Sequence, residues 1–165
     1  MEERAPEVKQ AEEKLYKGEV SEAIRILEQY IISHPEDYYA INKLGVAFVN
    51  DGKIARAREC FLRAIEINPK FAPPYSNIGN LCTESGKYEE ALIWYKKAIE
   101  IDPNFSSART NLAHLYRLTG RIDMAVDELK KAYHREGGWT GSISRNWWLW
   151  ILVVAGILYF VYRGS

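Results

Sequence analysis

The chain has 165 residues, of which 47% are hydrophobic and 27% charged, a composition typical of a globular domain with room for one further segment. Its 22 basic and 22 acidic residues cancel, and no run of Lys and Arg is long enough to follow a phosphate backbone, so nucleic acid is not an expected partner. The two cysteines, Cys60 and Cys82, have neither a C-x-x-C spacing nor clustered histidines, which argues for a reducing compartment and against a disulfide framework or a zinc site.

Eight helices are predicted from the spacing of apolar residues along the chain. The first 14 residues contain no apolar core of the kind found in secretory signals, so no such signal is expected. The expected helices cover residues 4–17, 20–33, 38–51, 54–67, 72–85, 88–101, 106–119 and 122–135.

The predicted helices form pairs whose pattern recurs every 34 residues. The units are 4–37, 38–71, 72–105 and 106–139, and the third is the most regular. Numbering the places within each unit from one, four places carry the pattern. The eighth is Ala11, Gly45, Gly79 and Ala113; the fifteenth Gly18, Gly52, Gly86 and Gly120; the twentieth Ala23, Ala57, Ala91 and Ala125; and the thirty-second Pro35, Pro69, Pro103 and Gly137.

Each recurring residue type has a physical role at its place. Small residues at places eight, twenty and twenty-seven let two helix axes approach closely, while large residues at places seven, eleven and twenty-four fill the space between them. Glycine at place fifteen supplies the positive φ that ends the first helix, and proline at place thirty-two cannot continue the second. The pattern therefore predicts a helical hairpin in every unit.

This pattern resembles the tetratricopeptide repeat, over residues 4–139, or 136 of the 165 residues. In the third unit it is carried by Tyr75, Ile78, Gly79, Cys82, Gly86, Ala91, Tyr95, Ala98 and Pro103. The resemblance implies an all-α solenoid over residues 1–136, in which the first helices of the units line a concave groove and the second helices form the convex back. It also implies that the activity is binding of proteins or peptides.

The two terminal units depart from the pattern. Glu7, Lys14 and Tyr30 replace the expected aromatic, aromatic and alanine, which suits a polar end cap, although a unit missing from the array is the alternative. In the last unit Arg135 stands where Ile67 stands in the second, as expected for a helix with no successor to pack against.

Residues 137–146 are rich in glycine and serine and are predicted to be a flexible linker. Residues 147–162 follow, sixteen residues without a charge, and are predicted to be a single transmembrane helix. Such a helix is about 24 Å long, slightly short of the hydrocarbon core, so a buried or surface-lying helix is the alternative. A surface-lying helix needs a polar face, which this segment lacks.

The residues that flank the apolar segment favour a membrane anchor. The expected interfacial residues are Trp147, Trp148 and Trp150 at one end, Tyr159 and Tyr162 at the other, and the snorkelling Arg145 and Arg163 outside them. Basic residues lie mostly before the segment, at Lys130, Lys131, His134, Arg135 and Arg145. The positive-inside rule therefore predicts that the repeats face the cytoplasm, in a tail-anchored layout.

Candidate partner-binding residues follow from the places that the resemblance assigns to the groove. They are Asn42, Lys43, Asn77, Asn80, Asn111, His114 and Arg117. A side-chain amide both donates and accepts, so Asn77 and Asn111 could pair with an extended peptide backbone. This arrangement is similar to the asparagine ladder in the repeats of O-linked N-acetylglucosamine transferase, although asparagine is also common on soluble helix surfaces.

Two other functions find little support. Co-chaperone repeats grip a C-terminal carboxylate with two lysines, two asparagines and an arginine, whereas the matching residues here are Asn42, Val46, Asn77, Ser107 and Asn111. No histidine has a Ser, Cys or Asp at a spacing that would form a nucleophile pair, so no catalytic residue, cofactor or metal is expected. The predicted function is a membrane-tethered adaptor, and the alternative is an accessory subunit of a membrane complex.

Overall fold

The computed structural model describes residues 4–135, and within that range every regular element is a helix. The helices are α1 (Pro6–Tyr16), α2 (Val20–Ser33), α3 (Tyr38–Asn50), α4 (Ile54–Ile67), α5 (Pro73–Glu84), α6 (Tyr88–Ile101), α7 (Ser106–Leu118) and α8 (Ile122–Arg135). Each helix end lies within two residues of its predicted position, so the prediction of eight helices is confirmed.

The turn inside each hairpin is built by one glycine with a positive φ. These angles are 76° at Gly18, 73° at Gly52, 72° at Gly86 and 74° at Gly120. In each case the residue after the glycine donates its backbone N–H to a carbonyl five residues earlier, as Lys53 does to Phe48 at 2.8 Å. This bond closes the end of the first helix and turns the chain into the second.

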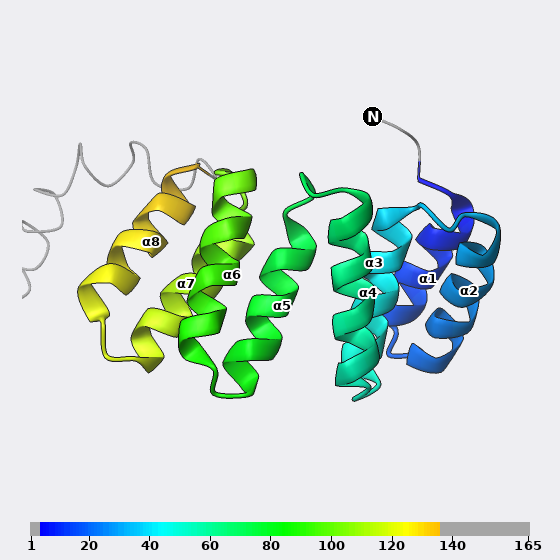
Figure 1. Ribbon diagram of the computed structural model, residues 1–165, viewed down its shortest axis with the longest axis horizontal. Coiled ribbons are helices and arrows are strands. Elements are labelled where there is room, and N and C mark those ends of the chain that lie inside the picture. The colour runs from blue at the N-terminus through cyan, green and yellow to red at the C-terminus, as the bar shows by residue number, and fades with distance from the viewer. Residues whose placement is uncertain (1–3, 136–165) are drawn as a thin grey trace, which may run out of the picture.

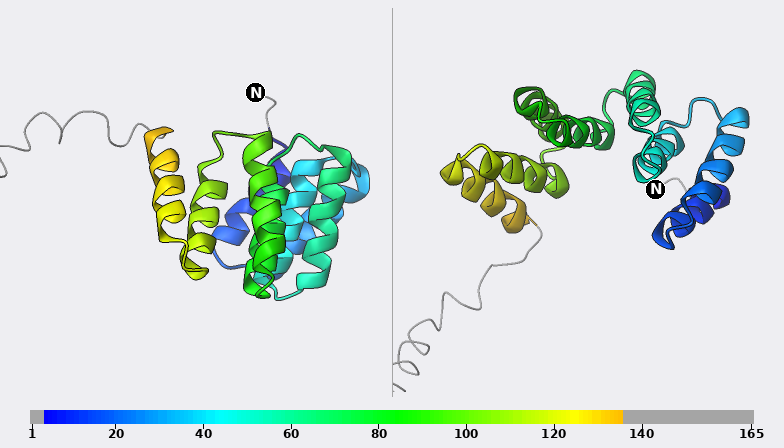
Figure 2. Two further views of the ribbon diagram at one scale, coloured as in Figure 1. Left: turned by 60° about the vertical axis from the view of Figure 1, so that its left-hand side comes forward. Right: turned by 90° about the horizontal axis from the view of Figure 1, so that it is seen from below.

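The hairpins lie side by side in chain order and follow an arc (Figures 1 and 2). The contacts between helices show which side of the arc is the inner one. The backbones of α1, α3, α5 and α7 approach one another in succession, whereas those of α2, α4, α6 and α8 do not. The first helices therefore form the inner, concave face, as the resemblance implies. We call the surface of α1, α3, α5 and α7 the inner face.

The core runs between the two helices of each hairpin and on into the next hairpin. At place twenty-four, Phe61 and Tyr95 are fully buried and lie directly against the glycines at place eight, Gly45 and Gly79. The predicted exchange of small and large residues across the hairpin is thus confirmed.

None of the eight helices in the described part of the chain is both long and apolar enough to cross a membrane. The predicted linker, 137–146, and the predicted anchor, 147–162, lie outside the described residues. So do the interfacial residues predicted to flank that anchor, from Arg145 to Arg163.

Candidate partner-binding face

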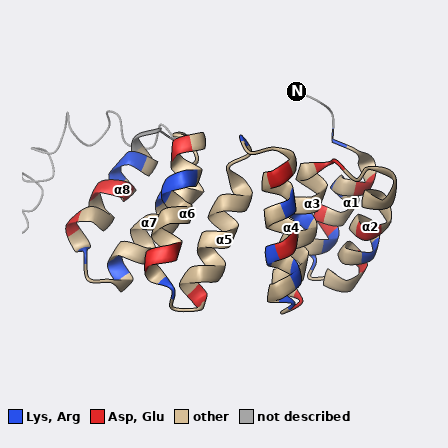
Figure 3. Cartoon of the chain, in the orientation of Figure 1, with Lys and Arg blue, Asp and Glu red and all other residues tan. Residues whose placement is uncertain are grey.

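The middle of the inner face carries few charged side chains. Within α3 the single charged side chain is Lys43, and α5 carries no charge before Glu84 at its last position (Figure 3). Polar contacts there are consequently made by amides and hydroxyls, which come from neighbouring units and meet across the boundaries between hairpins.

A network of amides joins α3, α5 and α7. Asn77 Nδ2 donates to Asn42 Oδ1 at 3.0 Å, and Asn111 Nδ2 donates to Asn80 Oδ1 at 2.9 Å and to Ser76 Oγ at 3.3 Å. Asn42 is only 4% exposed, so it holds Asn77 in place and does not itself offer a surface to a partner. The structure thus brings together the four asparagines predicted for the groove.

Asn80 is held in place by a hydrogen bond from the buried Tyr95 side chain. The Tyr95 hydroxyl donates to Asn80 Oδ1 at 2.8 Å and lies 3.1 Å from Thr83 Oγ1, which in turn donates to the Gly79 carbonyl at 2.9 Å. Burial raises the pKa of Tyr95, which keeps this hydroxyl protonated as a donor. Both acceptor positions of Asn80 Oδ1 are filled, so the amide is locked in one orientation.

Three atoms of this network remain without a hydrogen bond to any described residue: Asn77 Oδ1, Asn111 Oδ1 and Asn80 Nδ2. They supply two acceptors and a donor group on adjacent helices. Because each is held by other bonds of its own side chain, the set is preorganised for a ligand.

The first two units are joined by a charged cluster on α1 and α3. Glu12 Oε1 accepts from Lys43 Nζ at 2.6 Å and from the Tyr39 hydroxyl at 2.7 Å, and Arg4 lies 3.6 Å from Glu12 Oε2. Burial acts to raise the pKa of Glu12, but the bonds from Lys43 and Tyr39 outweigh it, and the pKa lies below the ordinary 4.5. Burial acts to lower the pKa of Lys43, but Glu12 outweighs it, and that pKa lies above 10.5.

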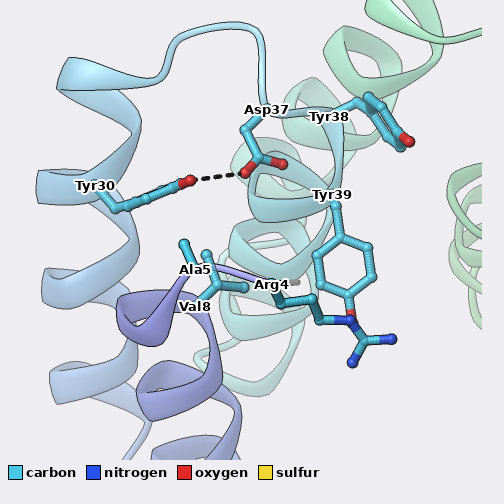
Figure 4. Close-up of a pocket in the computed structure, with 7 residues that line it drawn as sticks. All are labelled: Arg4, Ala5, Val8, Tyr30, Asp37, Tyr38 and Tyr39. Carbon is cyan, nitrogen blue, oxygen red and sulfur yellow. Dashed lines mark hydrogen bonds between the residues drawn. The ribbon is translucent and has the colours of Figure 1, made fainter. Parts of the chain in front are cut away.

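A pocket of about 540 Å³ opens beside this cluster, where the N-terminal ends of α1 and α3 meet α2. It is lined by Arg4, Ala5, Val8, Tyr30, Asp37, Tyr38 and Tyr39 (Figure 4). The Tyr30 hydroxyl donates to Asp37 Oδ2 at 3.0 Å, and the Arg4 guanidinium lies 4.7 Å from the centre of the Tyr39 ring. Tyr30, which departs from the repeat pattern, therefore serves as a wall of the pocket.

The last two predicted residues of the groove, on α7, form a pair of their own. Arg117 donates to His114 Nδ1 at 3.0 Å, and both side chains are exposed. An arginine cannot accept a hydrogen bond, so His114 Nδ1 is the acceptor and carries no proton in this arrangement.

Chemistry-bearing side chains also lie outside the inner face. His34 Nδ1 lies 3.0 Å from Ser33 Oγ, but that hydroxyl donates to the Tyr30 carbonyl, and the imidazole stacks on the Tyr30 ring. Burial raises the pKa of Cys60 to about 11, and that of Cys82 is raised for the same reason. Within residues 4–135 no group of three or more His, Cys, Asp or Glu could hold a metal ion.

Sequence reasoning missed Glu12 and the role of Tyr95. Glu12 occupies place nine of the first unit, the same place as Asn80 and His114, so the repeat register could have found it. The first unit was interpreted as an end cap, and none of its residues was assigned to the groove. Lys43, predicted to face a partner, is instead bound to Glu12.

Replacing Glu12 with glutamine is expected to lower the free energy of unfolding by about 1 kcal/mol at pH 7, because it removes one charge of a partly buried ion pair. The folded pKa of Glu12 is below 4.5, so the advantage of wild type is present above pH 4.5 and is lost as the pH falls through the folded value. The folded pKa of Lys43 is above 10.5, so the advantage is lost again as the pH rises through that value.

Urea unfolding followed by circular dichroism, at neutral pH and at acidic pH, measures this difference. Glu22→Gln is the control, because its ion pair with Arg25 lies on the exposed surface of a single helix. Equal losses for the two variants at neutral pH would contradict the assigned role of Glu12.

Comparison with known proteins identifies related families and structures. A family model described as tetratricopeptide repeat matches residues 8–72, a second with that description matches 60–93, and one described as TPR repeat matches 79–120. A search of the curated proteins gave no match.

Several solved structures are similar. The crystal structure of MamA superposes with a TM-score of 0.67 at 27% identity, over 79% of this chain and 77% of MamA. TTC0263, a thermophilic TPR protein in Thermus thermophilus, gives a TM-score of 0.70 at 24% identity, over 76% and 70% of the two chains. The first TPR of Spaghetti (RPAP3), bound to the HSP90 peptide SRMEEVD, gives 0.62 at 21% identity, over 69% of this chain and 90% of that one.

Proposed function

The chain belongs to the tetratricopeptide-repeat proteins, and on that premise we propose that its inner face holds an extended segment of a partner protein while residues 147–162 tether it to a membrane. The proposal assigns a binding role to the chain and no catalytic one. Its three parts, the bound segment, the anchor and the orientation, are supported by different observations.

The amide network is the observation that carries the proposal. An extended backbone offers alternating N–H and C=O groups, which are complementary to the free oxygens of Asn77 and Asn111 and the free nitrogen of Asn80. Neighbouring packed helices lie about 8–10 Å apart, so an extended peptide advances about three residues between α5 and α7. One backbone group of the partner in every three residues or so would then meet a fixed amide.

In this proposal the pocket beside Tyr39 receives one side chain of the bound segment and so sets where the segment lies. Tyrosines, Ala5 and Val8 line it together with the charged Arg4 and Asp37, which suits an aromatic side chain of the partner that also carries a polar group (Figure 4). A related domain in RPAP3 was solved with a peptide bound, which supports a peptide as the ligand class. Because none of the five residues at the places of the co-chaperone pattern is a cation, an acidic C-terminal tail is not the proposed ligand.

Partner capture is expected to fall at least about tenfold in the Asn77→Ala/Asn111→Ala variant, since two amide contacts to the ligand are lost. The measurement is recovery of bound proteins from cytosolic extract on the immobilised full chain, compared by mass spectrometry. The matched control is Gln29→Ala/Asn104→Ala, which removes two amides from α2 and from the loop before α7. Unchanged capture by the first variant, with its helical content intact, would refute the groove assignment.

Residues 147–162 support the membrane part of the proposal through their composition. They contain no charge, begin with three tryptophans among four residues and end near two tyrosines, as spanning helices do. The excess of basic residues before the segment, over Arg163 after it, supports repeats that face the cytoplasm.

Deleting residues 147–162 is expected to move the chain from the membrane pellet to the soluble fraction of a lysate. Extraction at alkaline pH distinguishes a spanning helix, which stays in the membrane, from a surface-bound one, which is released. Release of the full chain under these conditions would contradict a spanning anchor and leave partner capture on the inner face unaffected.

A second candidate is an accessory subunit that remains bound to a larger membrane complex. Ala155 and Gly156 favour it, because small residues in an apolar helix allow close packing against another helix. Co-migration with larger subunits after extraction in mild detergent would support this candidate, and migration as a free chain would count against it.

A further inference from the structure

The last helix of the solenoid leaves an apolar surface uncovered. In the described part of the chain, α7 is the one helix whose backbone approaches α8 (Figure 1). The uncovered residues, which we call the terminal stripe, are Ile122, Val126, Leu129 and Tyr133. Their exposed fractions are 55%, 44%, 37% and 62% in that order.

The repeat register shows that Val126, Leu129 and Tyr133 occupy places that normally pack in the core. Ile122 extends this surface, since Ile54 and Tyr88 at its place are 41% and 38% exposed even where another unit follows. Leu129 occupies place twenty-four, where Leu27, Phe61 and Tyr95 are fully buried in units whose second helix also packs against the first helix of the next unit. An end cap would carry polar residues here, as expected from Arg135, but three of the four residues in the terminal stripe are aliphatic. The terminal stripe is therefore a packing surface without its usual cover.

The chain beyond α8 does not continue the repeat. In register, the next first helix would begin at residue 140, and place eight would be Trp147 where every earlier unit has Gly or Ala. Place seven, which is Leu44, Ile78 or Leu112 in the preceding three units, would be Asn146. This sequence does not fit the position that a fifth unit would occupy.

We propose that the terminal stripe is covered by the same stripe of a second copy of this chain, with the two α8 helices antiparallel. The residues are spaced by four, three and four positions, a pattern that is unchanged when its direction is reversed. Antiparallel pairing therefore sets Ile122 against Tyr133 of the second copy and Val126 against Leu129 of the second copy. At 100° per residue the four side chains fall within about 60° of one another, the narrow seam typical of paired helices.

Charge at the edge of the stripe matches the same pairing. Asp123 and Lys130 lie about 80° further round the helix, on its solvent side, and neither makes an ion pair with a described residue. The reversal that pairs the apolar residues brings Asp123 beside Lys130 of the second copy, and the two-fold symmetry repeats this contact. In a parallel two-fold pair Asp123 and Lys130 of the two copies would lie on opposite edges of the interface and could not meet.

The contact is small, since each chain contributes one helix, and lies at the lower end of specific interfaces, below about 1,200 Å². We expect a dissociation constant on the order of 10 µM. The proposal is independent of partner capture on the inner face, because α8 takes no part in that surface.

The test uses the full chain in detergent, with its mass measured by light scattering over a range of concentrations. Wild type is expected to shift from monomer to dimer, and Asp123→Lys or Lys130→Asp alone to raise the dissociation constant about tenfold or more, because each turns two attractions into two repulsions. A mixture of the two single variants restores both attractions and is expected to form a heterodimer with nearly wild-type affinity.

Apolar contacts are tested separately with Tyr133→Asp, which is expected to abolish the dimer. The matched control is Met124→Asp, since Met124 is 53% exposed on the opposite side of α8, and this variant is expected to dimerise like wild type. Circular dichroism confirms that each variant is folded.

Three results would overturn the proposal. The first is a wild-type chain that remains monomeric at about 100 µM, ten times the expected dissociation constant. The second is a dimer indifferent to both charge changes, which would be held elsewhere, for example through residues 147–162. The third is a monomer destabilised by Tyr133→Asp, which would show that residues 136–165 of the same chain cover the stripe.

Discussion

Replacing Gly45 with alanine is expected to destabilise the protein by about 2–3 kcal/mol, although alanine favours helices. A Cβ atom at this position would lie 2.5 Å from Phe61 Cε1 and 2.8 Å from Cδ1 of the same ring. Phe61 is fully buried in the core and cannot swing aside, so α3 and α4 would be forced apart.

Other units of the chain indicate a second substitution that would compensate for Gly45→Ala. In the first and last units the residues at places eight and twenty-four are Ala11 with Leu27 and Ala113 with Leu129, whereas the second unit has Gly45 with Phe61. The Gly45→Ala/Phe61→Leu variant is thus expected to recover most of the loss, since it recreates a pair that the same hairpin geometry already accommodates. Urea unfolding of the single and double variants measures the loss of stability and its recovery. A double variant less stable than Gly45→Ala would contradict this account of the packing.

Replacing Glu128 with alanine is expected to cost about 3 kcal/mol and to loosen α8 from the rest of the solenoid. Glu128 Oε2 accepts from Arg109 Nη1 at 2.8 Å, and the two side chains are 14% and 12% exposed. Arg109 also donates to the Pro103 carbonyl, so the pair fastens α8 to α7 and to the loop before it. Its loss leaves the Arg109 charge largely buried without a carboxylate.

Hydrogen exchange locates this effect, because amides of α7 and α8 should lose protection while those of α1 to α4 keep theirs. The Arg109→Met/Glu128→Leu variant serves as the companion, since it removes both charges and keeps similar volumes; it is expected to regain at least half of the lost stability. Uniform loss of protection along the whole chain would contradict a local role for the pair.

The hairpins could be predicted from sequence because their signals are local and repeated four times. Glycine at place fifteen, alanine at place twenty and the helical spacing between them define each unit, and no long-range contact is needed to recognise them. Place eight, which is Ala11 in the first unit and Gly45 in the second, shows what the repeat pattern does not predict. The register predicts a small residue there, but only the position of the Phe61 ring explains why alanine would be too large.

The candidate site was only partly predictable for a related reason. The register identifies which residues face inward, yet it does not determine which of them bind one another. Asn42 was assigned to a partner but is buried beneath Asn77, and Lys43 was assigned to a partner but binds Glu12 from another unit. Such contacts depend on the rotation between successive hairpins, which no single unit encodes.

The bonds that join successive hairpins differ between the inner and the outer face, and this difference affects how the solenoid bends. On the inner face the second, third and fourth hairpins are joined by short bonds between buried or half-buried amides, Asn42 to Asn77 and Asn80 to Asn111. On the outer face they are joined by exposed ion pairs of long side chains, Arg56 to Glu28 and Arg58 to Glu90, which salt weakens. The solenoid is therefore expected to resist extension along its inner edge and to yield along its outer edge. A higher ionic strength is therefore expected to let the hairpins separate more easily on the outer face, while the asparagines keep them together on the inner face.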